Sequence, residues 1–548
     1  MQPRRFEIMV TGDIKNINLS ISSFERMITE GNLYVDKTKL IEHFLKSPST
    51  VQLVARQRRL GKSLNMDMIR CFLTSSEDLR HLFKGLYVES SPVWGEANSA
   101  PVFYFSFKGL RPDTYRRMIY DMICDYIENY CTDANISRAV RRYLSSNDFD
   151  NTEGLKHLTE SVYRATGRRS YILIDEYDKM LLESYNSNMY EEIRSFETAL
   201  FSAGLKDNPY LEKALLTGVM RISHESMFSG LNNIVTHDVF GDDVYTDDYG
   251  LTDVEIESLC KLASIDMEEV RAWYNGITIG GHAIYNIYSV MSYIAHGKFD
   301  CYWGKSGAMD MIIDLLNDNR KATIARLLNG EKVEVSIANR ISLRHLSDKS
   351  SDQAFYSLLV QAGYLALHEN VPSLATTTLV SIPNTELMMV WKGFILESLY
   401  TDTPKLKTLF DNTKDLGVFA NNLEYFLRDR LSYHDLAAYK GDSQIQERLY
   451  HMFLLGILSA YDDVRCSYPL SNRESGDGRY DVLVQKPEVN FIFEFKASDS
   501  VEGLAEKAQE ALAQIEAKRY GADLDKGKRL VKVGVAFCGK LCTVLCGE

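Results

Sequence analysis

Three small groups of polar residues in this sequence have types and spacings suited to phosphate chemistry. In the first group, Gly61, Lys62 and Ser63 follow an apolar run, VQLV, and precede a helical pattern. Backbone N–H groups at a helix start can surround phosphates, a lysine can reach the outer oxygens, and a hydroxyl can ligate Mg²⁺. These residues form the end of a Walker A motif, although Arg56 stands where the full motif has its first glycine.

The second group lies 112 residues after Ser63, at the end of the apolar run YILI. Asp175 and Glu176 there have the form of a Walker B strand that ends in two acids. The pattern predicts that Asp175 holds the Mg²⁺ shell and that Glu176 orients or deprotonates the attacking water. A strand ending in a solvated turn is the alternative, and the upstream glycine-lysine-serine makes it the weaker one.

Other polar residues near these groups are candidates for contacts to a nucleotide. Thr217 ends the next apolar strand and Arg221 lies just beyond it, so either side chain could sense the γ-phosphate. A turn cap and a surface cation are equally open interpretations of these two residues. Arg58 and Arg59, inside the loop, could add positive charge to the phosphate cradle and compensate for the missing glycine.

The third group lies near the C-terminal end, in the stretch NFIFEFK, residues 490–496. Side chains alternate between the two faces of a strand, so Glu494 and Lys496 share a face while three phenylalanines take the other. Asp481 opens the preceding strand, 13 residues before Glu494. Two carboxylates could bind one Mg²⁺, which activates water, while the amine stabilises developing charge. A solvated strand edge stays open as the alternative.

Further residues could complete that third site. Glu447, on the preceding helical segment, is a candidate acid. Gln514 and Lys518 are spaced i and i+4 on a later helical segment, so they share one face and could line the same cleft.

The elements that must position these residues fall into three regions. Residues 1–250 alternate apolar strands (50–57, 100–107, 170–177, 213–220) with helical stretches (113–131, 187–204), which predicts an α/β domain with a mainly parallel sheet. Residues 251–435 have mostly helical periodicity. Residues 436–548 predict a small α/β domain in which a helix and two strands precede a long helix (501–520) and a last strand (531–537).

Composition limits the function classes. The chain has 548 residues, 45% of them hydrophobic and 25% charged, which is ordinary for globular domains. Its net charge of −13 argues against non-specific coating of nucleic acid, and residues 441–548 are also acidic, with 14 Lys/Arg against 17 Asp/Glu. We find no apolar run that could span a membrane and no signal-peptide pattern, and nine scattered cysteines fit a reducing compartment, so we expect a cytoplasmic protein.

Several motifs together resemble the bacterial AAA-ATPase-like family. They follow one another through nearly the whole chain: YVDKT (34–38), RQRRLGKSLNM (56–66), ILIDEYDK (172–179), LTGVMRIS (216–223), FSGLNN (228–233), YGLTDVEI (249–256), WYNG (273–276), YNIYS (285–289), QAGYL (361–365) and IPN (382–384). In that family a loop of the RPRRFGKS type replaces the glycine-led form, which explains Arg56, although Gln57 stands where the family usually has proline. The family commonly ends in a PD-(D/E)XK nuclease-like domain, which residues 471–484 and 491–496 resemble.

The residues and the resemblance together predict an ATPase that uses ATP and Mg²⁺, coupled to a metal-dependent nuclease acting on DNA or RNA. Mn²⁺ could replace Mg²⁺ at the nuclease site, and the chain could form a homo-oligomer. The alternative is a nucleotide-switched interaction protein whose nuclease fold is inactive and serves as a binding module. A metabolic kinase is a weaker interpretation, because no acceptor pocket can be recognised in the sequence.

Overall fold

The computed structural model describes most of the chain. The described residues are 10–132, 134, 136–221, 233–240, 244–279, 282–303, 312, 315–328, 330–338, 351–368, 377–398, 409–410, 413–430, 467–471, 474–475, 478–522, 524–525, 527–539 and 541–548. They divide into two compact units, Met1–Lys305 with Glu334–Glu386, and Ser306–Val333 with Leu387–Glu548. The domain boundaries at residues 250 and 435 therefore stay predictions.

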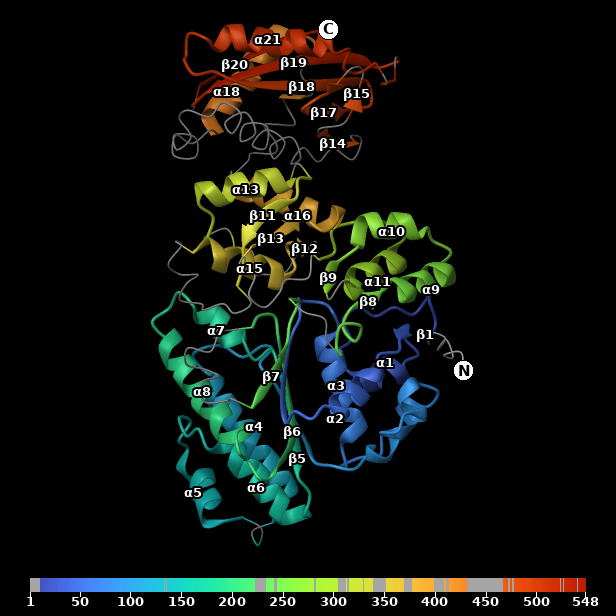
Figure 1. Ribbon diagram of the computed structural model, residues 1–548, viewed down its shortest axis with the longest axis vertical. Helices are drawn as coiled ribbons and strands as arrows, with labels where there is room; N and C mark the ends of the chain where they lie inside the picture. The colour runs from blue at the N-terminus through green and yellow to red at the C-terminus, as the bar shows by residue number, and fades with distance from the viewer. Residues whose placement is uncertain are drawn as a thin grey trace. The chain divides into compact units, whose positions relative to one another are not determined.

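A five-stranded parallel sheet forms the centre of the N-terminal region (Figure 1). Its strand order is β4-β5-β6-β3-β7, and every neighbouring pair is parallel. The strands are β3 (Val51–Ala55), β4 (Val102–Ser106), β5 (Ser170–Asp175), β6 (Leu211–Gly218) and β7 (Ile234–His237). All residues of β3 and β5 are buried, as expected for central strands covered on both faces. The predicted parallel α/β domain is confirmed.

Helices cover both faces of this sheet (Figure 1). On one side lie α1 (Phe24–Thr29), α2 (Lys39–Lys46) and α3 (Lys62–Leu73), and on the other α4 (Tyr115–Tyr130), α6 (Gly154–Thr166) and α8 (Tyr190–Leu205). The shorter α5 (Arg138–Ser146) and α7 (Lys179–Ser184) and the two-residue strands β1 (Val10–Thr11) and β2 (Tyr34–Val35) complete the region. The predicted helices 113–131 and 187–204 correspond to α4 and α8.

The middle region is helical, as predicted, and also contains two small sheets. Its helices are α9 (Asp253–Ala263), α10 (Met267–Tyr274), α11 (Ile287–His296), α13 (Asp318–Leu328), α15 (Asp352–Ala362) and α16 (Thr385–Ser398). One sheet joins β8 (Leu251–Thr252), β10 (His282–Tyr285) and β9 (Ile277–Ile279), and the other joins β11 (Val333–Ser336), β13 (Thr377–Ser381) and β12 (Ala366–Leu367). These strands are too short to show a two-residue periodicity in the sequence.

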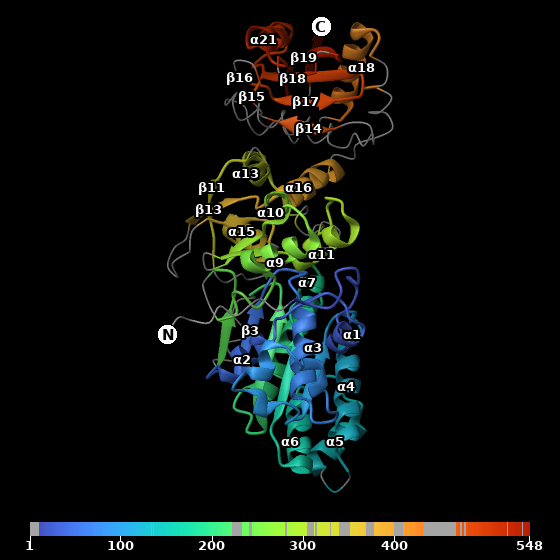
Figure 2. The same cartoon turned by 90° about the vertical axis from the view of Figure 1, so that its right-hand side faces the viewer.

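The C-terminal region is a second five-stranded sheet, in the order β14-β17-β18-β19-β20. Its strands are β14 (Ser467–Ser471), β17 (Val482–Gln485), β18 (Val489–Ala497), β19 (Arg529–Cys538) and β20 (Leu541–Gly547); β15 (Glu474–Ser475) and β16 (Gly478–Arg479) form a separate pair. Among the described strands of this sheet, β18 and β19 pair in parallel and the other neighbours pair antiparallel. Figure 2 shows α18 (Leu416–Arg430) and α21 (Leu504–Ala517) beside this sheet.

The alternation predicted for residues 490–496 decides which face of β18 each helix covers. Phe491, Phe493 and Phe495 are fully buried in a cluster that includes Phe419 of α18. Ile492 lies in a different cluster, with Ile515 of α21. The phenylalanine face therefore anchors the strand, and Glu494 and Lys496 lie on the face covered by α21. Among the described residues, no helix is long and apolar enough to cross a membrane.

Candidate functional site

The phosphate loop, defined here as residues 56–63, joins the end of β3 to the start of α3. Gly61 precedes the first helical residue, with φ +85°, and Arg59 also has a left-handed backbone, with φ +64°. Glycine adopts that conformation without steric cost, and the two left-handed positions turn the backbone sharply before the helix. Arg56, at the position of the missing first glycine, is fully buried, and its N–H donates to the carbonyl of Gly218.

The Lys62 ammonium lies inside this loop. It donates to the carbonyl oxygens of Arg56 (2.8 Å) and Gln57 (2.7 Å). Burial lowers the pKa of Lys62 to about 8, although the carboxylates of Asp175, Asp178 and Glu176 act in the opposite direction. The ammonium can exchange its hydrogen bonds with these neutral carbonyls for hydrogen bonds with phosphate oxygens. The exchange is favourable because the phosphate oxygens are charged.

Asp175 joins three strand ends to the phosphate loop. Its Oδ2 accepts from the Ser63 hydroxyl (2.5 Å) and from the Tyr104 hydroxyl (3.3 Å), and its Oδ1 accepts from Thr217 (2.6 Å). The parallel register explains the contact with Thr217, because these two residues are direct partners across β5 and β6. Tyr104 was not predicted; its alternating position in β4 carried only a weak signal.

The residues that follow Asp175 form a tight turn. Glu176 has φ +56°, an uncommon backbone for a residue with a side chain and one that occurs often at active sites. Asp178, which was not predicted, is buried, and its Oδ2 accepts from the N–H groups of Val219 and Met220, both at 2.8 Å. Burial raises the pKa of Asp178. Asp178 therefore fixes the chain just after β6, close to Thr217.

The three predicted arginines lie in different surroundings. Arg58 is close enough to Lys62 to lower its pKa. The Arg59 guanidinium instead donates to the Tyr302 carbonyl (2.8 Å) and lies 3.9 Å from the centre of the Tyr288 ring. The Arg221 guanidinium donates to Asp238 (2.8 Å). The structure thus brings Arg58 to the lysine but places Arg59 against the middle region.

Gly250, at the end of the N-terminal region, and further residues of the middle region also contact the phosphate loop. The Asn286 side chain donates to the Arg58 carbonyl (3.2 Å), and the Gly250 N–H donates to the Leu60 carbonyl (3.0 Å). A methyl group added at Gly61 would lie 3.2 Å from Ile287 of α11. The loop is thus enclosed by residues far from it in the sequence.

Glu386, at the start of α16, organises one part of this enclosure. Its Oε1 accepts from the Ser289 hydroxyl (3.0 Å) and from the N–H groups of Tyr302 (2.8 Å) and Trp303 (2.7 Å). Burial raises the pKa of Glu386 to about 7, against the opposing effects of those hydrogen bonds and of Arg59.

The third group of predicted residues is brought together in the C-terminal sheet. Val482 pairs with Phe493 across antiparallel strands, so Asp481 lies beside Glu494. Asp481 accepts from the Phe495 N–H (2.8 Å), and the Lys496 ammonium lies 3.6 Å from Glu494 Oε1. Desolvation raises the pKa of Asp481 to about 6, against the effects of the Phe495 N–H and the Lys496 charge.

Gln514 joins this group from α21, because its side-chain amide donates to Glu494 Oε1. No contact links Lys518 to the carboxylates, and Glu447 lies outside the described residues. Within the described part of the chain, no three His, Cys, Asp or Glu residues are grouped as metal ligands. The two carboxylates supply oxygen ligands that fit a hard cation bound with further oxygens from substrate or water, and the Lys496 ammonium stands beside them as a positive charge rather than as a ligand.

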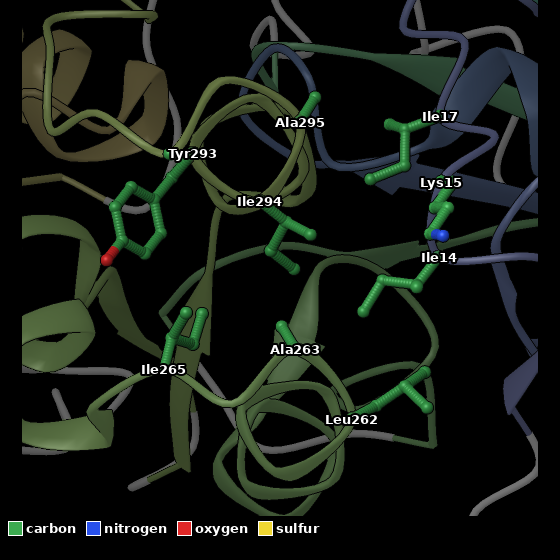
Figure 3. Close-up of a pocket in the computed structure, with 10 residues that line it drawn as sticks. Ile14, Lys15, Ile17, Leu262, Ala263, Ile265, Tyr293, Ile294 and Ala295 are labelled. Atoms are coloured by element: carbon green, nitrogen blue, oxygen red, sulfur yellow. The ribbon is translucent and has the colours of Figure 1, made fainter.

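The N-terminal unit also has a pocket of about 620 Å³ (Figure 3). Ile14 and Ile17 face residues of α9 and α11 across it, with Leu262 and Ile294 on the opposite side. Its lining side chains are apolar except for Lys15 and the hydroxyl of Tyr293, and none of the predicted site residues contributes to it.

The fold and these sites define a chain with a P-loop-type ATPase domain followed by a nuclease-like domain. Two family models match it: residues 18–228 match a family described as predicted AAA-ATPase, and residues 445–546 match the PD-(D/E)XK nuclease superfamily. The resemblance predicted from the motifs is confirmed.

Two individual proteins are similar to this chain. An "Uncharacterized protein in vnfD 5'region" from Azotobacter chroococcum mcd 1 is 27% identical over 550 residues, which cover 95% of this chain and 96% of that protein. The solved structure titled "The walker-type atpase paby2304 of pyrococcus abyssi" is 13% identical, with a TM-score of 0.33, and covers 65% of this chain and 94% of that one.

Proposed function

We propose that this protein binds and hydrolyses ATP in its N-terminal domain and that nucleotide state controls a metal-dependent cut of DNA or RNA by its C-terminal domain. The observation that carries the first half is the set of hydrogen bonds that places the Ser63 and Thr217 hydroxyls on one carboxylate, Asp175. Ser63 lies in the first turn of a helix after a phosphate loop, and Asp175 ends a central strand, which is the arrangement that P-loop enzymes need.

In this proposal each residue of the N-terminal site has a separate role. Backbone N–H groups at the start of α3 and the Lys62 ammonium bind the phosphates. Ser63 and Asp175 would hold Mg²⁺, which when bound neutralises charge on the phosphate oxygens. Glu176 orients or deprotonates the attacking water, and Arg58 adds positive charge beside Lys62.

The C-terminal site divides its roles in the same way. Asp481 and Glu494 would hold Mg²⁺ or Mn²⁺, which when bound lowers the pKa of an attacking water. Lys496 stabilises the charge that develops on the phosphate. Gln514 orients Glu494 through its hydrogen bond.

The ATPase half is tested by steady-state phosphate release from full-length protein, compared with Lys62→Ala. The variant should lose activity, because the phosphates lose their buried cation. Equal residual turnover by both proteins, with and without nucleic acid, would refute the ATPase.

The nuclease half needs a separate assay. Wild type, Asp481→Ala and Glu494→Ala should be incubated with single- and double-stranded DNA and RNA, with Mg²⁺ or Mn²⁺, and with or without ATP. Cleavage by wild type that disappears in both variants supports the proposal. Cleavage that survives in both variants would indicate a contaminating nuclease.

A second function is favoured by the charge of the chain. The net charge is −13, and residues 441–548 carry more acids than bases, so a strongly basic nucleic-acid groove is not apparent in the composition. In this alternative, ATP switches a docking surface and the nuclease fold only binds. Absence of cleavage on every substrate, together with normal ATP hydrolysis, would support the alternative.

A further inference from the structure

The end of β6 meets the end of α15 at a pair of buried polar side chains. The N–H of Arg221, three residues after β6, donates to Oε1 of Gln361 in α15 (2.8 Å). Gln361 is only 1% exposed. Its position in α15 lies outside residues 18–228, which match the ATPase family, and no role was predicted for it from the sequence.

Each of these two side chains keeps a buried donor without an acceptor. Among the described residues, neither the Gln361 amide nitrogen Nε2 nor the Arg221 Nε has a hydrogen-bond partner. The Arg221 guanidinium donates to Asp238 through its NH1. Buried donors are almost always paired in folded proteins, because an unpaired one loses its hydration without compensation. Two of them on hydrogen-bonded neighbours indicate a place for an acceptor-rich group.

The same pair is connected to the phosphate loop from two directions. Arg221 lies four residues after Thr217, which donates to Asp175. Gly363, two residues after Gln361, packs so closely against the Gln57 side chain that an added methyl group would collide with it. The Gln57 carbonyl in turn accepts from Lys62 (2.7 Å). Both donors are therefore at the carboxyl edge of the parallel sheet, where such folds bind ligands.

We infer that Gln361, together with Arg221, recognises the terminal phosphate of a nucleoside triphosphate. This inference rests on the proposed ATP binding of the N-terminal domain. A phosphate has oxygens for both orphan donors. Because Gln361 belongs to the middle region, that region would detect whether the third phosphate is present, and diphosphate binding would leave the two donors unpaired.

The test compares triphosphate with diphosphate affinity, using calorimetric titration of the full-length protein with Mg·ATPγS and Mg·ADP. Gln361→Glu keeps an acceptor for the Arg221 N–H but replaces the amide donor by a carboxylate oxygen. It should weaken ATPγS binding by roughly tenfold or more and ADP binding by less than about threefold. Gln361→Met introduces a neutral side chain of similar volume and should shift the ratio of ATPγS to ADP affinity in the same direction. It replaces the glutamate variant in the test if that variant does not fold.

Gln353 offers a matched control on the same helix. Its amide donates to the Ile337 carbonyl (2.8 Å), so Gln353→Glu also removes a donor from α15, at a position about two helical turns before Gln361. It should leave the ATPγS-to-ADP ratio unchanged. An unchanged ratio in both Gln361 variants would overturn the inference, whereas a wild type that binds neither nucleotide would refute the proposed ATP binding itself.

Discussion

The nuclease-like site depends on a close approach between a strand and a helix, and one glycine permits that approach. Gly534 of β19 is the register partner of Glu494 on the neighbouring strand. A methyl group added at Gly534 would collide with the carbonyl of Ala508 and lie 2.8 Å from the N–H nitrogen of Leu512, both backbone atoms of α21. Backbone atoms cannot rotate away, so Gly534→Ala must push the helix off the sheet.

The size of the effect follows from this geometry. Ordinary contact begins at 3.4 Å, so the helix must move by at least about 0.6 Å at Leu512 and further at Ala508. Overpacking of this kind costs about 1–3 kcal/mol, which should lower the melting temperature of a domain of this size by about 5 °C or more. The same movement should separate Gln514 from Glu494 and reduce any metal-dependent cleavage.

Hydrogen exchange on the full-length protein measures the change locally. Peptides from α21 and β19 should exchange faster in Gly534→Ala, while peptides from the N-terminal sheet should be unchanged. Gly547, on the adjacent strand β20, is the matched control, because a methyl group there would meet only the Leu512 side chain, at 3.7 Å and beyond. Equal protection of α21 in Gly534→Ala and Gly547→Ala would refute the steric argument.

Three further predictions concern the N-terminal unit. Asp178→Ala should lower kcat for ATP hydrolysis about tenfold, because the N–H groups of the two residues after β6 lose their acceptor. Asp178→Asn keeps an acceptor oxygen and should retain most of the activity. Equal losses of kcat in the two variants would contradict this prediction. The pKa of Glu386 is about 7 in the folded protein against an ordinary 4.5, so between these pH values the folded state holds a proton that the unfolded state has released. As the pH rises from 4.5 to about 7, the stability of the wild type should therefore fall relative to that of Glu386→Gln. Melting temperatures of the two proteins that change in parallel with pH would contradict this prediction. The buried Lys37 ammonium donates to both carboxylate oxygens of buried Glu255, at 2.6 and 2.7 Å. Lys37→Met should therefore lower the free energy of unfolding by about 3–5 kcal/mol in urea, because it leaves the Glu255 charge without its partner. Adding Glu255→Met should recover part of the loss, and no recovery would argue against an unpaired charge as the cause.

The sequence was most informative where a single buried strand leads directly into a motif. The buried strands β3 and β5 are continuous apolar runs, so their ends could be located, and Ser63 and Asp175 were predicted to act together on that basis. The alternation of Phe491, Phe493 and Phe495 likewise predicted which face of β18 is anchored. In each case local periodicity carries the information.

Contacts between distant segments were not predictable in this way. Nothing in the local sequence of Arg59 distinguishes a phosphate ligand from a residue that stacks on Tyr288, which lies more than 200 positions away. Asp178 resembles an ordinary polar residue of a turn until the chain after β6 is seen to donate to it. The strand β20 was not among the predicted elements, the last of which was the strand at residues 531–537.

The phosphate loop is held in place partly by residues that lie outside the segment that matches the ATPase family. Residues 18–228 match the ATPase family, yet the carbonyls of Arg58 and Leu60 accept from Asn286 and Gly250, and Arg59 is held at Tyr302. These are hydrogen bonds to backbone groups, so a small movement of the loop must be followed by the middle region or must break them. If nucleotide binding rearranges this loop, the middle region should therefore be the first part of the chain to move. The movement would be transmitted by these hydrogen bonds and not by the net charge of the ligand.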